Sequence, residues 1–117
     1  MENDAREELA RCESVLRRAQ AELRHAGPET YRHAAFFVEG AQGRVDYARS
    51  EFLPEACKDA LRILVDYASN QWLASHPSPR GSDPETRRTF VEVNVKTQLL
   101  GTLFHPKLEL SQHRMNE

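Results

Sequence analysis

The sequence predicts an all-α fold, an antiparallel three- or four-helix bundle built as a single helical domain over residues 1–117. Three observations lead to this prediction. Along three long segments, apolar residues recur at alternating spacings of three and four, the spacing of one face of a helix. Proline, glycine and capping residues separate the segments. The chain of 117 residues also has the length of one domain rather than two.

The first two predicted helices cover residues 4–26 and 29–53. Gly27 and Pro28 separate them, because glycine ends helices and proline is favoured at a helix start. The first apolar stripe consists of Leu9, Cys12, Leu16, Ala19, Leu23 and Ala26. The second consists of Ala34, Val38, Ala41, Val45, Ala48 and Phe52. Most residues of the second stripe are small, so a neighbouring helix could approach it closely.

The third and fourth predicted helices cover residues 54–75 and 84–104. Pro54 restarts the chain, and the third helix has the most apolar stripe, which we expect at the centre of the core: Leu53, Cys57, Ala60, Leu64, Tyr67, Gln71 and Ala74, widened by Leu61, Ile63, Ala68 and Trp72. Residues 76–83 form a loop rich in proline and serine, with His76 placed to cap the third helix. Ser82 or Asp83 caps the fourth helix ahead of Pro84. Residues 106–117 are expected to form a flexible tail.

An α+β fold is the alternative to the bundle. Two glycines interrupt the second segment, and residues 36–47 could form a β-hairpin around Gly-Ala-Gln-Gly. Val91, Val93 and Val95 alternate with polar residues, a period of two that is typical of a strand over 90–97. A short strand at 107–111 would complete this alternative. The continuous helical spacing across both glycines favours the bundle.

Charge and composition exclude several classes of protein. The 16 basic and 18 acidic residues are nearly balanced, whereas general nucleic-acid binders are usually basic. The two cysteines are too few for a disulfide scaffold. The acidic N-terminus does not resemble a secretory signal, and no segment approaches the ~20 apolar residues of a membrane span. We therefore expect a soluble cytoplasmic protein that does not bind membranes.

Few patterns in the sequence indicate catalysis. The glycines match neither a phosphate-binding loop nor a dinucleotide fingerprint, and there is no nucleophile elbow. The histidines are too far apart in sequence for a typical zinc site. We therefore expect no cofactor, no metal and no catalytic residue. One alternative remains open: Glu51, Glu55 and Asp59 follow a spacing of four, which would suit a small helical metal-dependent hydrolase.

Six residues are the candidates for contact with a partner. Arg17 and Arg18 give the end of the first helix a positive charge, and Arg87 with Arg88 lies near a helix start, where the dipole disfavours cations. Phe36 and Phe37 are adjacent and point about 100° apart on a helix, so both cannot lie on one narrow stripe.

The leading functional hypothesis is a non-enzymatic protein-interaction module, such as a small subunit, inhibitor or adaptor. It would act through its helix faces on another protein, or on a second copy of itself in a homodimer. A third hypothesis is a nucleic-acid-associated protein that uses the arginine-rich face of the first helix.

Overall fold

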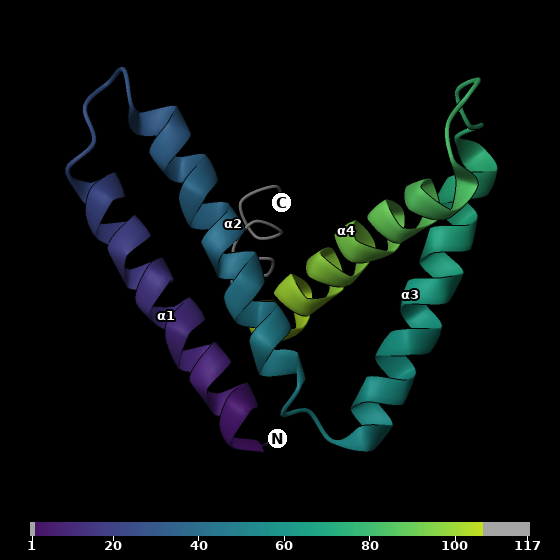
Figure 1. Cartoon of the computed structure of the whole chain (residues 1–117), viewed down its shortest axis with the longest axis horizontal. Coiled ribbons are helices and arrows are strands. Elements are labelled where there is room, and N and C mark those ends of the chain that lie inside the picture. Colours follow the sequence, from purple (N-terminus) through teal and green to yellow (C-terminus); the bar gives the residue numbers. More distant parts are fainter. Residues whose placement is uncertain (1, 107–117) are drawn as a thin grey trace, which may run out of the picture. The chain divides into compact units, whose positions relative to one another are not determined.

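The computed structural model describes residues 2–106, and within this range it contains four helices and no strand. They are α1 (Glu2–Arg24), α2 (Tyr31–Ser50), α3 (Glu55–Ser75) and α4 (Pro84–Phe104), shown in Figure 1. The predicted all-α fold is confirmed. None of these four helices is both long enough and apolar enough to cross a membrane.

The helix boundaries follow the proline and capping residues. Asp83 caps α4, its carboxylate accepting a hydrogen bond from the Thr86 amide, and Pro84 occupies the first turn as predicted. The helix α2 begins at Tyr31, two residues later than predicted. Residues 27–30 form a separate turn instead, in which the Thr30 amide donates to the Gly27 carbonyl over 3.1 Å.

The α+β alternative is not supported by the described part of the chain. Residues 36–47 lie within α2 and residues 90–97 within α4, while the proposed strand 107–111 lies outside the described residues. The alternation of valines is also compatible with a helix. Residues four apart lie on the same face of a helix, and the residue midway between them lies on the opposite face. Val91 is buried and Val95 half-buried, but Val93 between them is 47% exposed, as on a helix.

The chain divides into two compact units, residues 1–52 and 53–117. In the first, α1 and α2 pack as a helical hairpin (Figure 1). Ala19 of α1 is buried, as are Ala41 and Val45 of α2, and all three belong to the stripes predicted to face a neighbouring helix. The small side chains allow the two helices to approach closely.

The predicted flexible tail, apart from Pro106, lies outside the described residues.

In the second unit, α3 packs against α4 (Figure 1). The buried residues of α3 are Val65 and Ser69, and those of α4 are Val91 and Leu100. This corrects one expectation, because the apolar stripe of α3 was predicted to form the centre of the core. Leu64 and Tyr67 of that stripe are exposed, whereas the buried residues of α3 are Val65 and Ser69, which do not belong to the stripe.

Candidate interaction surface

The side of α3 that does not contact α4 is apolar and exposed. We call it the outward face of α3, and every one of its residues is exposed: Cys57, Ala60, Ile63, Leu64, Tyr67, Gln71 and Ala74. Exposure of the large side chains is 69% for Ile63, 52% for Leu64 and 64% for Tyr67. From Cys57 to Ala74 the face extends about 26 Å along the helix. An exposed apolar stripe of this length on a helix is a candidate surface for packing against another helix.

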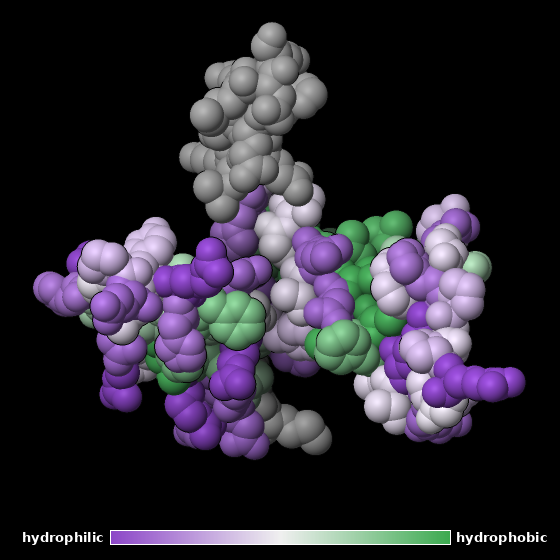
Figure 2. All heavy atoms as spheres, turned by 90° about the horizontal axis from the view of Figure 1, so that it is seen from above, coloured by the Kyte–Doolittle hydropathy of each residue, from purple (hydrophilic) through white to green (hydrophobic). Residues whose placement is uncertain are grey.

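No charged residue lies on the outward face. The charged residues of α3 lie at least about 110° around the helix from the centre of the stripe: Glu55, Lys58, Asp59, Arg62 and Asp66. In Figure 2, the hydrophobic surface on the visible side is concentrated over α3 and α4, whereas the surface over α1 and α2 is mostly hydrophilic. A contiguous exposed apolar patch marks an interaction site more often than scattered single residues do.

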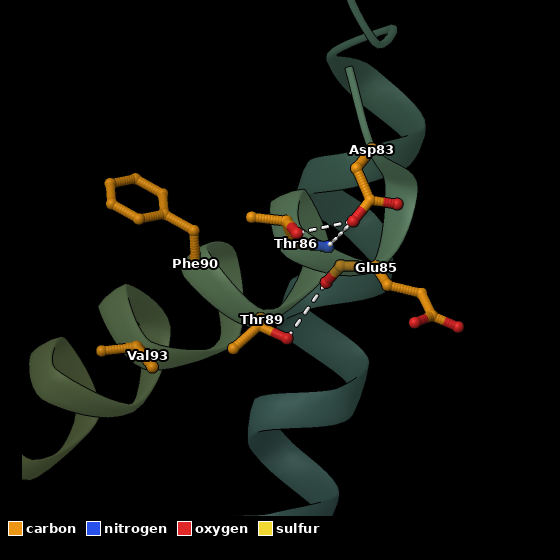
Figure 3. Close-up of a pocket in the computed structure, with 6 residues that line it drawn as sticks. All are labelled: Asp83, Glu85, Thr86, Thr89, Phe90 and Val93. Carbon is orange, nitrogen blue, oxygen red and sulfur yellow. Dashed lines mark hydrogen bonds between the residues drawn. The ribbon is translucent and has the colours of Figure 1, made fainter. Parts of the chain in front are cut away.

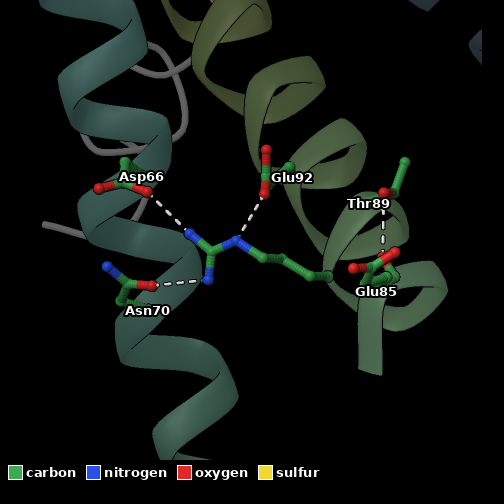
Figure 4. Close-up of polar contacts among 6 residues, drawn as sticks. Asp66, Asn70, Glu85, Thr89 and Glu92 are labelled. Carbon is green, nitrogen blue, oxygen red and sulfur yellow. Dashed lines mark hydrogen bonds and ion pairs between the residues drawn. The ribbon is translucent and has the colours of Figure 1, made fainter. Parts of the chain in front are cut away.

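Arg88 joins the opposite side of α3 to α4. Its guanidinium donates to Asp66 over 2.7 Å and to Asn70 over 2.8 Å, both on α3, and also pairs with Glu92 over 2.8 Å (Figure 4). One planar guanidinium thus satisfies three acceptors in a fixed geometry. Asp66 and Asn70 lie 22 and 18 residues before Arg88 and on a different helix, so spacing within one helix did not reveal this pairing.

Arg87 holds the loop between α3 and α4. It donates to the Ser78 hydroxyl over 2.6 Å and to the His76 carbonyl, and its guanidinium lies 5.3 Å from the centre of the Trp72 ring. The His76 ring stacks on Trp72 at 4.0 Å, and its Nδ1 lies 2.8 Å from the Trp72 carbonyl oxygen. His76 therefore caps α3 as predicted. Both Arg87 and Arg88 have intramolecular partners, and their predicted contact with a binding partner stays a prediction.

The start of α4 borders a second exposed surface. A shallow hollow of about 500 Å³ lies along this helix, lined by Asp83, Glu85, Thr86, Thr89, Phe90 and Val93 (Figure 3). Phe90 is 70% exposed. Hydrogen bonds from the Thr86 hydroxyl and amide hold the pKa of the Asp83 carboxyl below its usual value. The carboxylate therefore remains ionised and keeps capping α4 below the pH at which an ordinary aspartate is protonated.

The other predicted contact residues lie in the first unit. Arg17 and Arg18 are exposed on α1, and neither forms an ion pair within the described residues. Phe36 is 73% and Phe37 51% exposed on α2, so both are accessible rather than one. The contact of these four residues with a partner stays a prediction.

A smaller hollow of about 310 Å³ lies between α1 and α2, with Cys12 and Tyr47 among its lining residues. Burial raises the pKa of the Cys12 thiol, and a hydrogen bond to Glu8 raises it further. Burial also raises the pKa of the Tyr47 phenol. A thiol with a raised pKa is mostly protonated at neutral pH, which makes it a poor nucleophile.

The carboxylates of the hydrolase hypothesis have cations of their own helix beside them. Glu55 lies 3.6 Å from Lys58, and Asp59 lies 3.2 Å from Arg62. Glu51 follows α2 as its C-terminal cap. Among residues 2–106, no group of three or more histidine, cysteine, aspartate or glutamate side chains is arranged to hold a metal ion.

Sequence reasoning singled out the residues of the outward face but assigned them to the core. Asp66 of α3 bonds to α4 through Arg88, and no pattern within α3 alone indicates that pairing. Comparison with known protein families, curated proteins and solved structures found no match to this chain.

Proposed function

We propose that this chain is a non-enzymatic protein-interaction module whose binding surface is the outward face of α3. The occupant is a helix of a second protein chain, either a copy of this chain or a different protein, with an apolar and uncharged contact face. The observation that carries the proposal is a helix side of about five turns without any charge, on which Ile63, Leu64 and Tyr67 are each more than half exposed.

The energetics favour an apolar occupant. Burying the exposed part of Ile63, Leu64 and Tyr67 would contribute about 1–2 kcal/mol for each side chain, once the value for full burial is scaled by the exposed fraction. A charged partner surface would bind unfavourably here. Its charges would lose their hydration on binding, and the outward face holds no opposite charge to compensate for that loss. Tyr67 and Gln71 add polar groups that can form hydrogen bonds within the contact.

The test is a comparison of surface variants in co-purification. Tagged wild-type chain, Leu64→Glu and the control Arg17→Glu/Arg18→Glu are each incubated with cell lysate and with an untagged copy of the chain. The proposal expects one protein, either the copy or another chain, to be retained near stoichiometrically by wild type and the control and lost with Leu64→Glu. A protein other than the copy is then purified and its binding to the three forms measured by calorimetry.

Two results would contradict the proposal. One is a wild-type chain that retains neither the copy nor any other protein. The other is retention that Leu64→Glu leaves unchanged while the arginine variant abolishes it. That second result would move the binding surface to α1, where Arg17 and Arg18, two of the six candidates from the sequence, lie.

A further inference from the structure

We infer that the occupant of the outward face of α3 is a second copy of the same chain, packed antiparallel with its own α3 against this face; the inference rests on the proposed function. Three features of the face support it: its heptad spacing, its self-complementarity and its lack of charge. The first is that Cys57, Leu64 and Gln71 alternate with Ala60, Tyr67 and Ala74 at spacings of three and four. This is the seam of a two-helix coiled coil.

The second feature is the self-complementarity of the stripe about a point between Leu64 and Tyr67. When two copies run antiparallel about this point, Cys57 lies opposite Ala74, Ala60 opposite Gln71, and Leu64 opposite Tyr67. Large residues therefore meet at the centre, small residues meet at the outer ends, and between them the small Ala60 faces the longer Gln71. The contact is closed and self-complementary, as a two-fold interface requires.

A parallel pair fits less well. It would place each residue against itself, with Gln71 on Gln71 inside the seam and Ala60 on Ala60 across a gap. It would also align the two helix dipoles in the same direction, whereas the antiparallel pair sets the positive end of each helix beside the negative end of the other.

The third feature is the lack of charge on the face. Two identical faces bring identical charges together, and like charges across an interface are costly. The outward face of α3 avoids this cost because all charges of the helix lie elsewhere. A contact of seven residues per copy is small compared with the roughly 20–30 residues of a standard interface, so the expected Kd is about 1–100 μM.

The first experiment is sedimentation equilibrium of the full-length chain, carrying Cys12→Ser, from about 1 to 500 μM, a range that brackets the expected Kd. The average mass should rise with concentration from 13.4 kDa towards twice that value. Leu64→Glu should weaken the association at least about tenfold. Arg62→Glu should leave it unchanged, because it adds the same side chain to the same helix away from the outward face.

The second experiment determines orientation. A short bis-maleimide is preferable to a disulfide, because packed helix axes lie about 8–10 Å apart. In the Cys12→Ser background, Ala74→Cys should give a covalent dimer joined between Cys57 and the new cysteine of the other copy. Arg62→Cys should not. A predominant Cys57-to-Cys57 product in the Cys12→Ser chain would overturn the antiparallel arrangement.

A chain that remains monomeric throughout would overturn the inference, and the reactivity of Cys57 then separates it from the proposed function. If Cys57 reacts freely with maleimide, the face is open, and the proposed function stands with a different protein as the occupant. If Cys57 is protected and Leu64→Glu lowers the melting temperature, the face is covered within the chain, and both proposals fail.

Discussion

The two helical hairpins use their apolar stripes in opposite ways. In α1–α2, the predicted stripes face each other and bury Ala19, Ala41 and Val45. In α3–α4, the heptad stripe of α3 faces solvent, while the contact with α4 contains Val65, Ser69 and the polar contacts of Arg88. Apolar periodicity thus identifies a helix face that will be covered, but it does not identify what covers it.

The largest expected difference between the two hairpins comes from placing the same charged residue in each stripe. Val45→Asp should destabilise the chain by about 3 kcal/mol or more, because Val45 is fully buried and the carboxylate would have no partner there. Leu64→Asp should cost less than about 1 kcal/mol, since that site is exposed. Urea unfolding followed by circular dichroism at about 1 μM, at the lower end of the expected Kd, measures both. Equal losses would mean that both stripes are core.

A second test separates polar from apolar stabilisation of the hairpins. Arg88→Ala should cost about 1–2 kcal/mol because it removes three contacts at once, each weakened by its exposure to solvent. Arg49→Ala should cost less than about 0.5 kcal/mol, since its pair with Glu13 in the other hairpin is 3.7 Å long and exposed. Arg88→Lys should fall between, because lysine lacks the planar fork. If Arg88→Ala proved as mild as Arg49→Ala, the α3–α4 contact would be held mainly by buried apolar side chains such as Val65 and Val91.

The hairpins also bury one serine each, and the two should respond with opposite signs. Ser50 donates to the Tyr47 carbonyl over 2.6 Å, so Ser50→Ala should destabilise by about 1 kcal/mol. The Ser69 hydroxyl is buried without a hydrogen-bond partner in the described part of the chain, so Ser69→Ala should stabilise by about 1 kcal/mol. The denaturation midpoint of each variant, compared with that of wild type, measures these changes in stability. A loss at Ser69 equal to that at Ser50 would show that its hydroxyl does find a partner.

One glycine within a helix of each hairpin gives a smaller test. A Cβ added at Gly40 of α2 or at Gly101 of α4 meets no atom within 4 Å. Gly40→Ala should therefore stabilise by about 0.8–1 kcal/mol, and Gly101→Ala by less because it lies in the last turn of its helix. Thermal melts of the two variants test this. A destabilising Gly40→Ala would point to a neighbour that contacts the glycine closely.

Most of the fold could be predicted from local signals. Helix starts and ends follow Pro54, Asp83 and Pro84, which act on their immediate neighbours, and the boundaries agree within a few residues. The direction in which α3 faces could not be predicted, because it depends on contacts between residues about twenty positions apart. Arg88 reaches Asp66 and Asn70 across the hairpin, and no pattern within one helix encodes that choice.

The sequence identified residues of the candidate site but not their role. Leu64 and Tyr67 were recognised as a stripe, but a stripe was equated with a core. Arg87 and Arg88 were selected because cations are unfavourable near a helix start. That reasoning holds for an isolated helix, whereas in the hairpin the Trp72 ring, Asp66 and Asn70 compensate for the unfavourable position.

The smallest expected effect is a pH dependence of stability that comes from the Asp83 cap of α4. The start of α2 has no such cap, because the Thr30 side chain forms no capping hydrogen bond. Because hydrogen bonds from Thr86 lower the pKa of Asp83 in the folded state, its contribution to stability is complete above the unfolded pKa, about 3.9. It is lost as the pH falls through the lower folded value. Asp83→Asn keeps an acceptor for the Thr86 amide but does not titrate. The melting temperature of wild type should therefore exceed that of Asp83→Asn at pH 6, and the difference should shrink between pH about 4 and 2. All other carboxylates titrate in both proteins and cancel, so a difference independent of pH would show that the ionised cap does not stabilise α4.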